Sequence, residues 1–133
     1  MEYNQITSQI IGAAMRVHTE LGPGLLESAY EGCLAFELTS RNIEFGRQVA
    51  LPVVYRGNRI DVGYRLDLLV ADLVIVEIKA VERILPIHEA QLMTYLKLAD
   101  KRVGLLLNFN VLSMQDGIVR RVNKLGSQWG RLG

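Results

Sequence analysis

Asp67, Glu77 and Lys79 are the residues whose types and spacing could do chemistry in this chain. They lie in residues 64–80, a stretch otherwise dominated by Leu, Val, Ile and Ala. Burying unpaired charge costs free energy, so charge inside such a run asks for an explanation. Glu77 and Lys79 are two residues apart, so on a strand their side chains would point to the same face.

The same stretch predicts an antiparallel hairpin with its turn centred near Asp72. That register sets Asp67 opposite Glu77, with their Cβ atoms about 4.5–5.5 Å apart. Two carboxylates at that separation repel each other unless a cation lies between them. The register also sets Arg65 opposite Lys79. The alternative without chemistry is a cross-strand ion network at a sheet edge.

Metal-assisted hydrolysis of a phosphodiester bond needs side chains of these types. Asp67 and Glu77 could hold Mg²⁺, or Mn²⁺, and leave positions for a water and a phosphate oxygen. A metal bound in this way lowers the pKa of water and stabilises developing negative charge. Lys79 would orient or deprotonate the attacking water, or stabilise the pentavalent state.

The elements that must position these residues follow from hydrophobic periodicity. Apolar residues at three- and four-residue steps over 6–21 predict an amphipathic helix that ends at Gly22. A second helix is expected from about 25 to 40. Alternating patterns predict three strands, at 45–55, 59–69 and 73–80.

The second half of the chain predicts a crossover connection. Pro86, in the favoured first-turn position, predicts a helix over about 87–99. The apolar run 103–109 predicts a strand buried on both faces. Asp116-Gly117 indicates a turn before a short strand at 118–122.

The resulting order, ααβββαββ, predicts an α/β fold with a central mixed β-sheet flanked by helices. The chain has 133 residues, of which half are hydrophobic and 22% are charged, so we expect one domain over 1–133. In the tail from Asn123, Trp129 is the one large apolar anchor.

Composition excludes several classes of protein. A formal net charge of +1 argues against a strongly electropositive nucleic-acid binder, although a local basic face stays open. Cys33 is the single cysteine, which indicates a reducing compartment. No signal-peptide pattern or membrane-length apolar run is found, so we expect a cytoplasmic location and no membrane partner. Phosphate-loop, serine-elbow and zinc-ligand patterns are also missing.

Several motifs carry a resemblance to a known family. Asp67…Glu77-Ile-Lys79 resembles the core of the PD-(D/E)XK nuclease superfamily, with Leu66 in place of the proline that names the motif. Gly24-Leu-Leu-Glu27-Ser-Ala-Tyr30 is similar to the signature of the GxxExxY family, a bacterial branch of that superfamily. The stretches 86–98 and Leu107-Asn-Phe-Asn110, with the following Asp116-Gly117, are also similar to that family, so the resemblance covers about residues 5 to 122. It implies a restriction-endonuclease-like core and a Mg²⁺-dependent nuclease acting on DNA, or on RNA.

Similarity to RecB-type nucleases extends the implied site to two helices. Glu27 would join Asp67 and Glu77 at the metal; its alternative reading is a carboxylate favoured by the helix dipole. Gln91 and Tyr95 match a Gln-x-x-x-Tyr pattern that would position catalytic residues or contact the nucleic-acid backbone; their alternative is a half-buried face. We expect Glu31 to be an ordinary solvated residue and His88 to lie at a helix start or rim.

Other functions remain open at this stage. A second hypothesis is a catalytically inactive nucleic-acid-binding or protein-interaction module that kept the fold, acting within a complex or as a homodimer. A homodimer would also help so small a nuclease to grip duplex DNA. A third class is an interaction scaffold or an enzyme acting on a small phosphorylated substrate.

Overall fold

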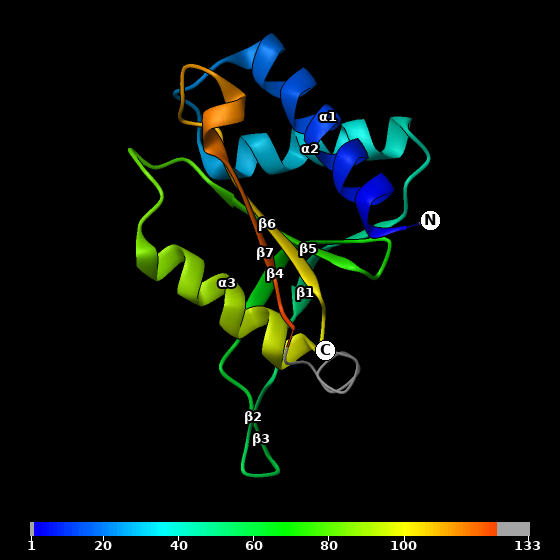
Figure 1. The fold of residues 1–133 in the computed structure, drawn as a ribbon, viewed down its shortest axis with the longest axis vertical. Helices are drawn as coiled ribbons and strands as arrows, with labels where there is room; N and C mark the ends of the chain where they lie inside the picture. The colour runs from blue at the N-terminus through cyan, green and yellow to red at the C-terminus, as the bar shows by residue number, and fades with distance from the viewer. Residues whose placement is uncertain (1, 125–133) are drawn as a thin grey trace.

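The computed structural model describes residues 2–124, drawn in Figure 1. The predicted tail anchor Trp129 lies outside the described residues. Three α-helices are present in the described part: α1 (Tyr3–Leu21), α2 (Glu27–Ser40) and α3 (Pro86–Ala99). The other elements are β1 (Phe45–Ala50), β2 (Val53–Tyr55), β3 (Asn58–Ile60), β4 (Arg65–Val70), β5 (Val74–Lys79), β6 (Val103–Asn108), the 3₁₀ turn η1 (Met114–Gly117) and β7 (Ile118–Val122).

A five-stranded mixed sheet forms the middle layer, in the order β1-β4-β5-β6-β7. Neighbouring strands are antiparallel except β5 and β6, which are parallel because α3 crosses over between them. Helices α1 and α2 lie on one side of the sheet and α3 lies on the other (Figure 1). The predicted α/β class, the mixed sheet and the crossover are therefore confirmed.

Each face of the sheet has its own hydrophobic core. Val74, Val76 and Ile78 of β5 pack toward α1 and α2, whereas Ile75 packs toward α3. All six residues of β6 are buried, as the apolar run predicted. Glu77 thus belongs to a strand that is covered on both faces.

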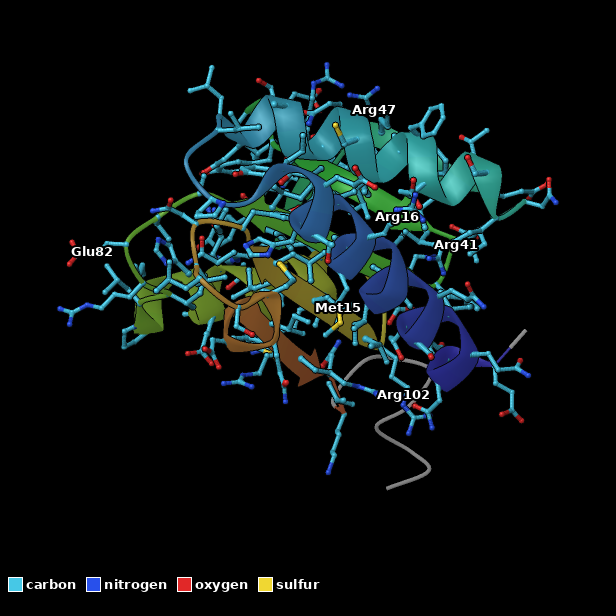
Figure 2. All side chains as sticks on the ribbon, turned by 90° about the horizontal axis from the view of Figure 1, so that it is seen from above. Met15, Arg16, Arg41, Arg47, Glu82 and Arg102 are labelled. Carbon is cyan, nitrogen blue, oxygen red and sulfur yellow. The ribbon has the colours of Figure 1, made fainter. Side chains whose placement is uncertain are left out.

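Helices α1 and α2 lie side by side above the sheet (Figure 2). Arg41, directly after α2, joins the two helices because its guanidinium donates to Gln9 Oε1 of α1. Gly22 ends α1 by donating its N–H to His18 O, as the sequence predicted. The buried Tyr30 hydroxyl fixes the connecting loop, since it donates to Gly22 O and accepts from Leu25 N–H. Within residues 2–124, the chain contains no helix with the length and apolar character of a membrane span.

Two long predicted strands are wrong. The segment 45–55 divides into β1 and β2, and 59–69 divides into β3 and β4. Pro52 cannot donate to a ladder, which favours a break at this point. Strands β2 and β3 instead pair with each other through a two-residue turn at Arg56 and Gly57, both with positive φ. This hairpin projects from the rest of the fold (Figure 1).

The chain also differs from prediction near the end of the sheet. Asp116-Gly117 belongs to the 3₁₀ turn η1 and not to a simple strand-to-strand turn. A Cβ atom at Gly117 would lie 2.0 Å from Asn108 O, so only glycine permits this close approach of the backbones. Strand β7 at Ile118–Val122 agrees with the predicted bounds.

Candidate active site

Asp67 and Glu77 lie opposite each other in the β4–β5 hairpin, in the predicted register. Leu68 pairs with Val76 and Val70 with Val74, which places the centre of the hairpin at Asp72. Beyond the Leu68–Val76 pair, carboxylates take the place of ladder hydrogen bonds. Glu77 Oε2 accepts from Asp67 N–H at 2.9 Å, and Asp67 Oδ2 accepts from Ile78 N–H at 2.8 Å. Each carboxylate is therefore held by the backbone of the opposite strand.

Burial disfavours the charged forms of both carboxylates in this acid pair. Glu77 is only 6% exposed, and burial together with the charge of Asp67 raises the pKa of Glu77 to about 8. Burial also raises the pKa of Asp67, with a further contribution from Glu31. A pKa near 8 means that Glu77 holds a proton at neutral pH when no metal ion is bound. A bound cation would favour the charged form of both carboxylates, so the pair suits a metal ion.

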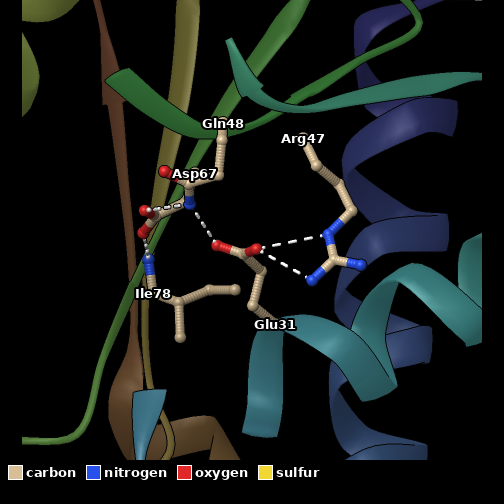
Figure 3. Close-up of polar contacts among 5 residues, drawn as sticks. All are labelled: Glu31, Arg47, Gln48, Asp67 and Ile78. Atoms are coloured by element: carbon tan, nitrogen blue, oxygen red, sulfur yellow. Dashed lines mark hydrogen bonds and ion pairs between the residues drawn. The ribbon is translucent and has the colours of Figure 1, made fainter. Parts of the chain in front are cut away.

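Glu31 belongs to this site, and its prediction as a solvated residue is wrong. Its carboxylate is buried and bound on both sides (Figure 3). Glu31 Oε2 accepts from Arg47 Nη2 at 3.0 Å, while Oε1 accepts from Gln48 Nε2 at 2.7 Å. Gln48 Nε2 also lies 3.4 Å from Asp67 Oδ1. Glu31 follows Glu27 by four residues, so the shared helix face was the signal that could have revealed it.

The backbone at Gln48 explains how β1 reaches this site. Gln48 has a φ of 50°, a left-handed conformation that interrupts the strand. On one side of it Arg47 contacts α2, and on the other Val49 packs into the core beneath α3. The same switch of faces occurs opposite, between Leu68 and Leu66. Gln48 and Asp67 therefore lie at a break in the alternation of both strands.

Lys79 is the last residue of β5, and its charge opposes the rise in pKa of both Asp67 and Glu77. Its ammonium group is thus close enough to interact with the acid pair. Arg65, which the predicted register sets opposite Lys79, lies beyond the ladder between β4 and β5, whose pairs run from Leu68–Val76 to Val70–Val74. On the other edge of β4, Arg65 pairs with Ala50 of β1, and its guanidinium donates to Gln48 O at 3.1 Å.

Glu27, in the first turn of α2, reaches the end of β5. Its Oε2 accepts from Ala80 N–H at 3.2 Å, one residue beyond Lys79. Within the described chain, however, no three His, Cys, Asp or Glu side chains are grouped so that they could hold a metal ion. Asp67 and Glu77 are thus in direct contact, through the hydrogen bond from Asp67 N–H to Glu77 Oε2, whereas the Glu27 carboxylate accepts from the backbone at Ala80.

Tyr95 and Gln91 approach from α3, on the opposite side from Glu31. Burial raises the pKa of Tyr95, and the charges of Glu77 and Asp67 add to the rise, so this tyrosine lies within electrostatic range of the acid pair. Gln91 is exposed one helical turn earlier and lines the same groove as Tyr95. His88 Nδ1 accepts from Leu85 N–H at 2.9 Å, which confirms its predicted place at the helix start.

Comparison with known proteins identifies a family for this chain. The profile of the PD-(D/E)XK nuclease superfamily matches residues 4–122. No curated protein and no solved structure matches the chain significantly. The match covers α1 through β7 and includes the sheet that carries Asp67, Glu77 and Lys79. The mixed sheet flanked by helices is consistent with a restriction-endonuclease-like core. The chain therefore belongs to the PD-(D/E)XK nuclease superfamily.

Proposed function

We propose that this chain is a metal-dependent nuclease that hydrolyses phosphodiester bonds of DNA or RNA. The observation that carries the proposal is the buried Asp67–Glu77 pair, with each carboxylate fixed by a backbone N–H of the facing strand. Such a pair is costly to bury, and its raised pKa values are typical of functional sites. Superfamily membership supports the same activity.

Asp67 and Glu77 would hold the metal, with Mg²⁺ the expected ion and Mn²⁺ a substitute. A divalent ion at this pair would supply positive charge that activates water and neutralises a phosphate oxygen. The proton that Glu77 retains near neutral pH would leave when the ion binds. Glu27 would complete the ligand set if its carboxylate exchanged its bond to Ala80 N–H for one to the ion.

The remaining residues would act around that pair. Lys79 would orient the attacking water or stabilise charge on the phosphate, since its ammonium group interacts with both acids. Glu31 would hold Asp67 in place through the Gln48 amide. From α3, Tyr95 and Gln91 would position the catalytic groups or contact the nucleic-acid backbone.

A second candidate function is a binding module that kept the nuclease fold without catalysis. One observation favours it: Glu27 does not join the acid pair, and the described residues contain no three-residue metal cluster. Such a module would bind nucleic acid or another protein, within a complex or as a homodimer. A cytoplasmic location is part of both proposals.

The deciding experiment is a titration of Mg²⁺ or Mn²⁺ into the wild type and a Glu77→Ala/Lys79→Ala variant. Cleavage of labelled single- and double-stranded DNA and RNA is followed in the same samples. We expect metal-dependent cleavage that falls by about 10²-fold or more in the variant, as is usual when an acid–base group is lost. The matched control is Arg16→Ala/Glu20→Ala, which removes an exposed ion pair on α1.

Each outcome separates the candidates. Cleavage that is lost in the variant and retained in the control supports the nuclease. Metal binding without cleavage supports the binding module. Cleavage that survives in Glu77→Ala/Lys79→Ala would contradict the proposed site, and the absence of metal binding in the wild type would make the acid pair structural.

A further inference from the structure

A groove of about 520 Å³ lies between α3 and the segments that flank the β2–β3 hairpin. Tyr95, Gln91 and Thr94 line it from α3, and Tyr64 lines it from the residues just before β4. The rings of Tyr64 and Tyr95 are 6.1 Å apart between centroids and tilted by 49°. The volume of the groove is within the range of small-molecule binding sites.

The lining of this groove suits a flat, uncharged ring. None of the residues that line it is Lys, Arg, Asp or Glu. Apolar and aromatic side chains predominate, and the Gln91 amide, the Thr94 hydroxyl and His88 supply polar contacts. A phosphate group would find no cation there, whereas a nucleobase could stack on tyrosine and hydrogen-bond to an amide.

Tyr95 links the groove to the acid pair. The same side chain lines the groove, contacts Tyr64 and packs in one buried cluster with Leu66, the residue before Asp67 on β4. Tyr64 itself is 47% exposed, so its ring is available for stacking. A strand whose phosphate lay at the acid pair could therefore place a neighbouring base in the groove.

We propose that this groove binds an unpaired nucleobase, and that the chain acts on single-stranded nucleic acid or on single-stranded regions. The inference rests on the proposed nuclease function for the position of the phosphate. A base inside a duplex has both faces stacked on its neighbours and cannot enter the groove without unpairing. Single strands offer the base without that cost.

The test measures equilibrium binding of labelled single-stranded and fully paired oligonucleotides, in DNA and RNA arms, with Ca²⁺ in place of Mg²⁺. One strand carries 2-aminopurine, whose fluorescence is quenched on stacking. Wild type should bind the single strand more tightly and quench the probe. Because a base–aromatic stack contributes about 1–3 kcal/mol, Tyr64→Ala should weaken single-strand binding about tenfold and abolish the quenching.

Two further variants keep the test specific. Tyr64→Phe retains an aromatic face and should bind like the wild type. Tyr55→Ala removes an exposed tyrosine of β2 that does not line the groove, and it should leave binding unchanged. Circular dichroism of each variant confirms that it is folded.

The inference is overturned if Tyr64→Ala binds single strands normally, or if duplex and single strand bind equally well and respond equally to the substitution. It is also overturned if Tyr64→Ala converts a dimer to a monomer in sedimentation, because a second copy would then occupy the groove. Quenching that depends on Tyr64 in a protein that never cleaves would support the groove and remove the nuclease proposal. Cleavage that is unchanged in Tyr64→Ala would support the nuclease proposal and remove the proposed role of the groove.

Discussion

The two ends of the β4–β5 hairpin satisfy their backbone N–H groups in different ways. Near the turn, Leu68, Val70, Val74 and Val76 form a regular antiparallel ladder whose side chains are fully buried. At the open end, the N–H groups of Asp67 and Ile78 donate to carboxylates instead. The closed end is apolar, while the open end holds two acids whose pKa values are raised by burial.

This difference separates stability from chemistry within one hairpin. The closed end joins the core beneath α1 and α2 and fixes the register. The open end keeps two like charges close together, which opposes folding at high pH but offers a site for a cation. The apolar closed end thus holds the strands in the register that lets Asp67 and Glu77 accept hydrogen bonds from the facing backbone.

The largest effect is expected from adding a carboxylate at Leu68, one residue further into the closed end than Asp67. Leu68 is 0% exposed and faces the core, so Leu68→Asp would bury a charge without a partner. We expect a loss of at least about 4 kcal/mol in the free energy of unfolding, measured by urea denaturation. Leu68→Ala is the control and should cost about 2–5 kcal/mol through a cavity alone. Equal losses in the two variants would show that the closed end tolerates charge.

An intermediate effect is expected from Glu77→Gln at the open end. The pKa of Glu77 is raised from 4.5 to about 8, so the folded state holds this proton more tightly than the unfolded chain. Its contribution to stability is complete below pH 4.5 and is lost as pH rises toward 8. In metal-free buffer, the free energy of unfolding of the wild type should therefore fall over this window.

Glu77→Gln should flatten that dependence and be about 1–3 kcal/mol more stable than the wild type at pH 8, relative to their difference at low pH. Chemical denaturation across the pH range measures it. Added Mg²⁺ should stabilise the wild type at pH 8 and leave Glu77→Gln unaffected. A wild type whose stability rises between pH 4.5 and 8 in parallel with the variant would contradict the raised pKa.

The smallest effect is expected from Glu31→Gln, which keeps a side chain of the same shape beside Gln48. The charge of Glu31 raises the pKa of both Asp67 and Glu77, so its removal should lower both. The pH-dependent loss of stability should become smaller and end at a lower pH. Arg47→Ala serves as the contrast, because it leaves the buried Glu31 without its cation and should cost about 1–3 kcal/mol. An unchanged pH profile in Glu31→Gln would limit Glu31 to an anchoring role.

Local patterns gave the parts of the fold that depend on neighbours in sequence. The bounds of α3, the buried strand β6 and the end of α1 at Gly22 follow from Pro86, an unbroken apolar run and a glycine cap. The long strands failed because alternation over 45–55 and 59–69 does not show where a ladder finds its partner. The prediction for Glu31 failed for a similar reason, since Glu31 lies on α2 and its partners Arg47 and Gln48 come from β1.

The sequence by itself determined the opposition of Asp67 and Glu77, because a strand's period of two and a turn near Asp72 fix the register. It also placed Lys79 on the same strand as Glu77. Only the tertiary structure decided that backbone N–H groups hold the two acids, that Glu31 and Gln48 support Asp67, and that Tyr64 meets Tyr95 in a groove. Those contacts join residues from separate elements, and packing rather than periodicity sets which of them meet.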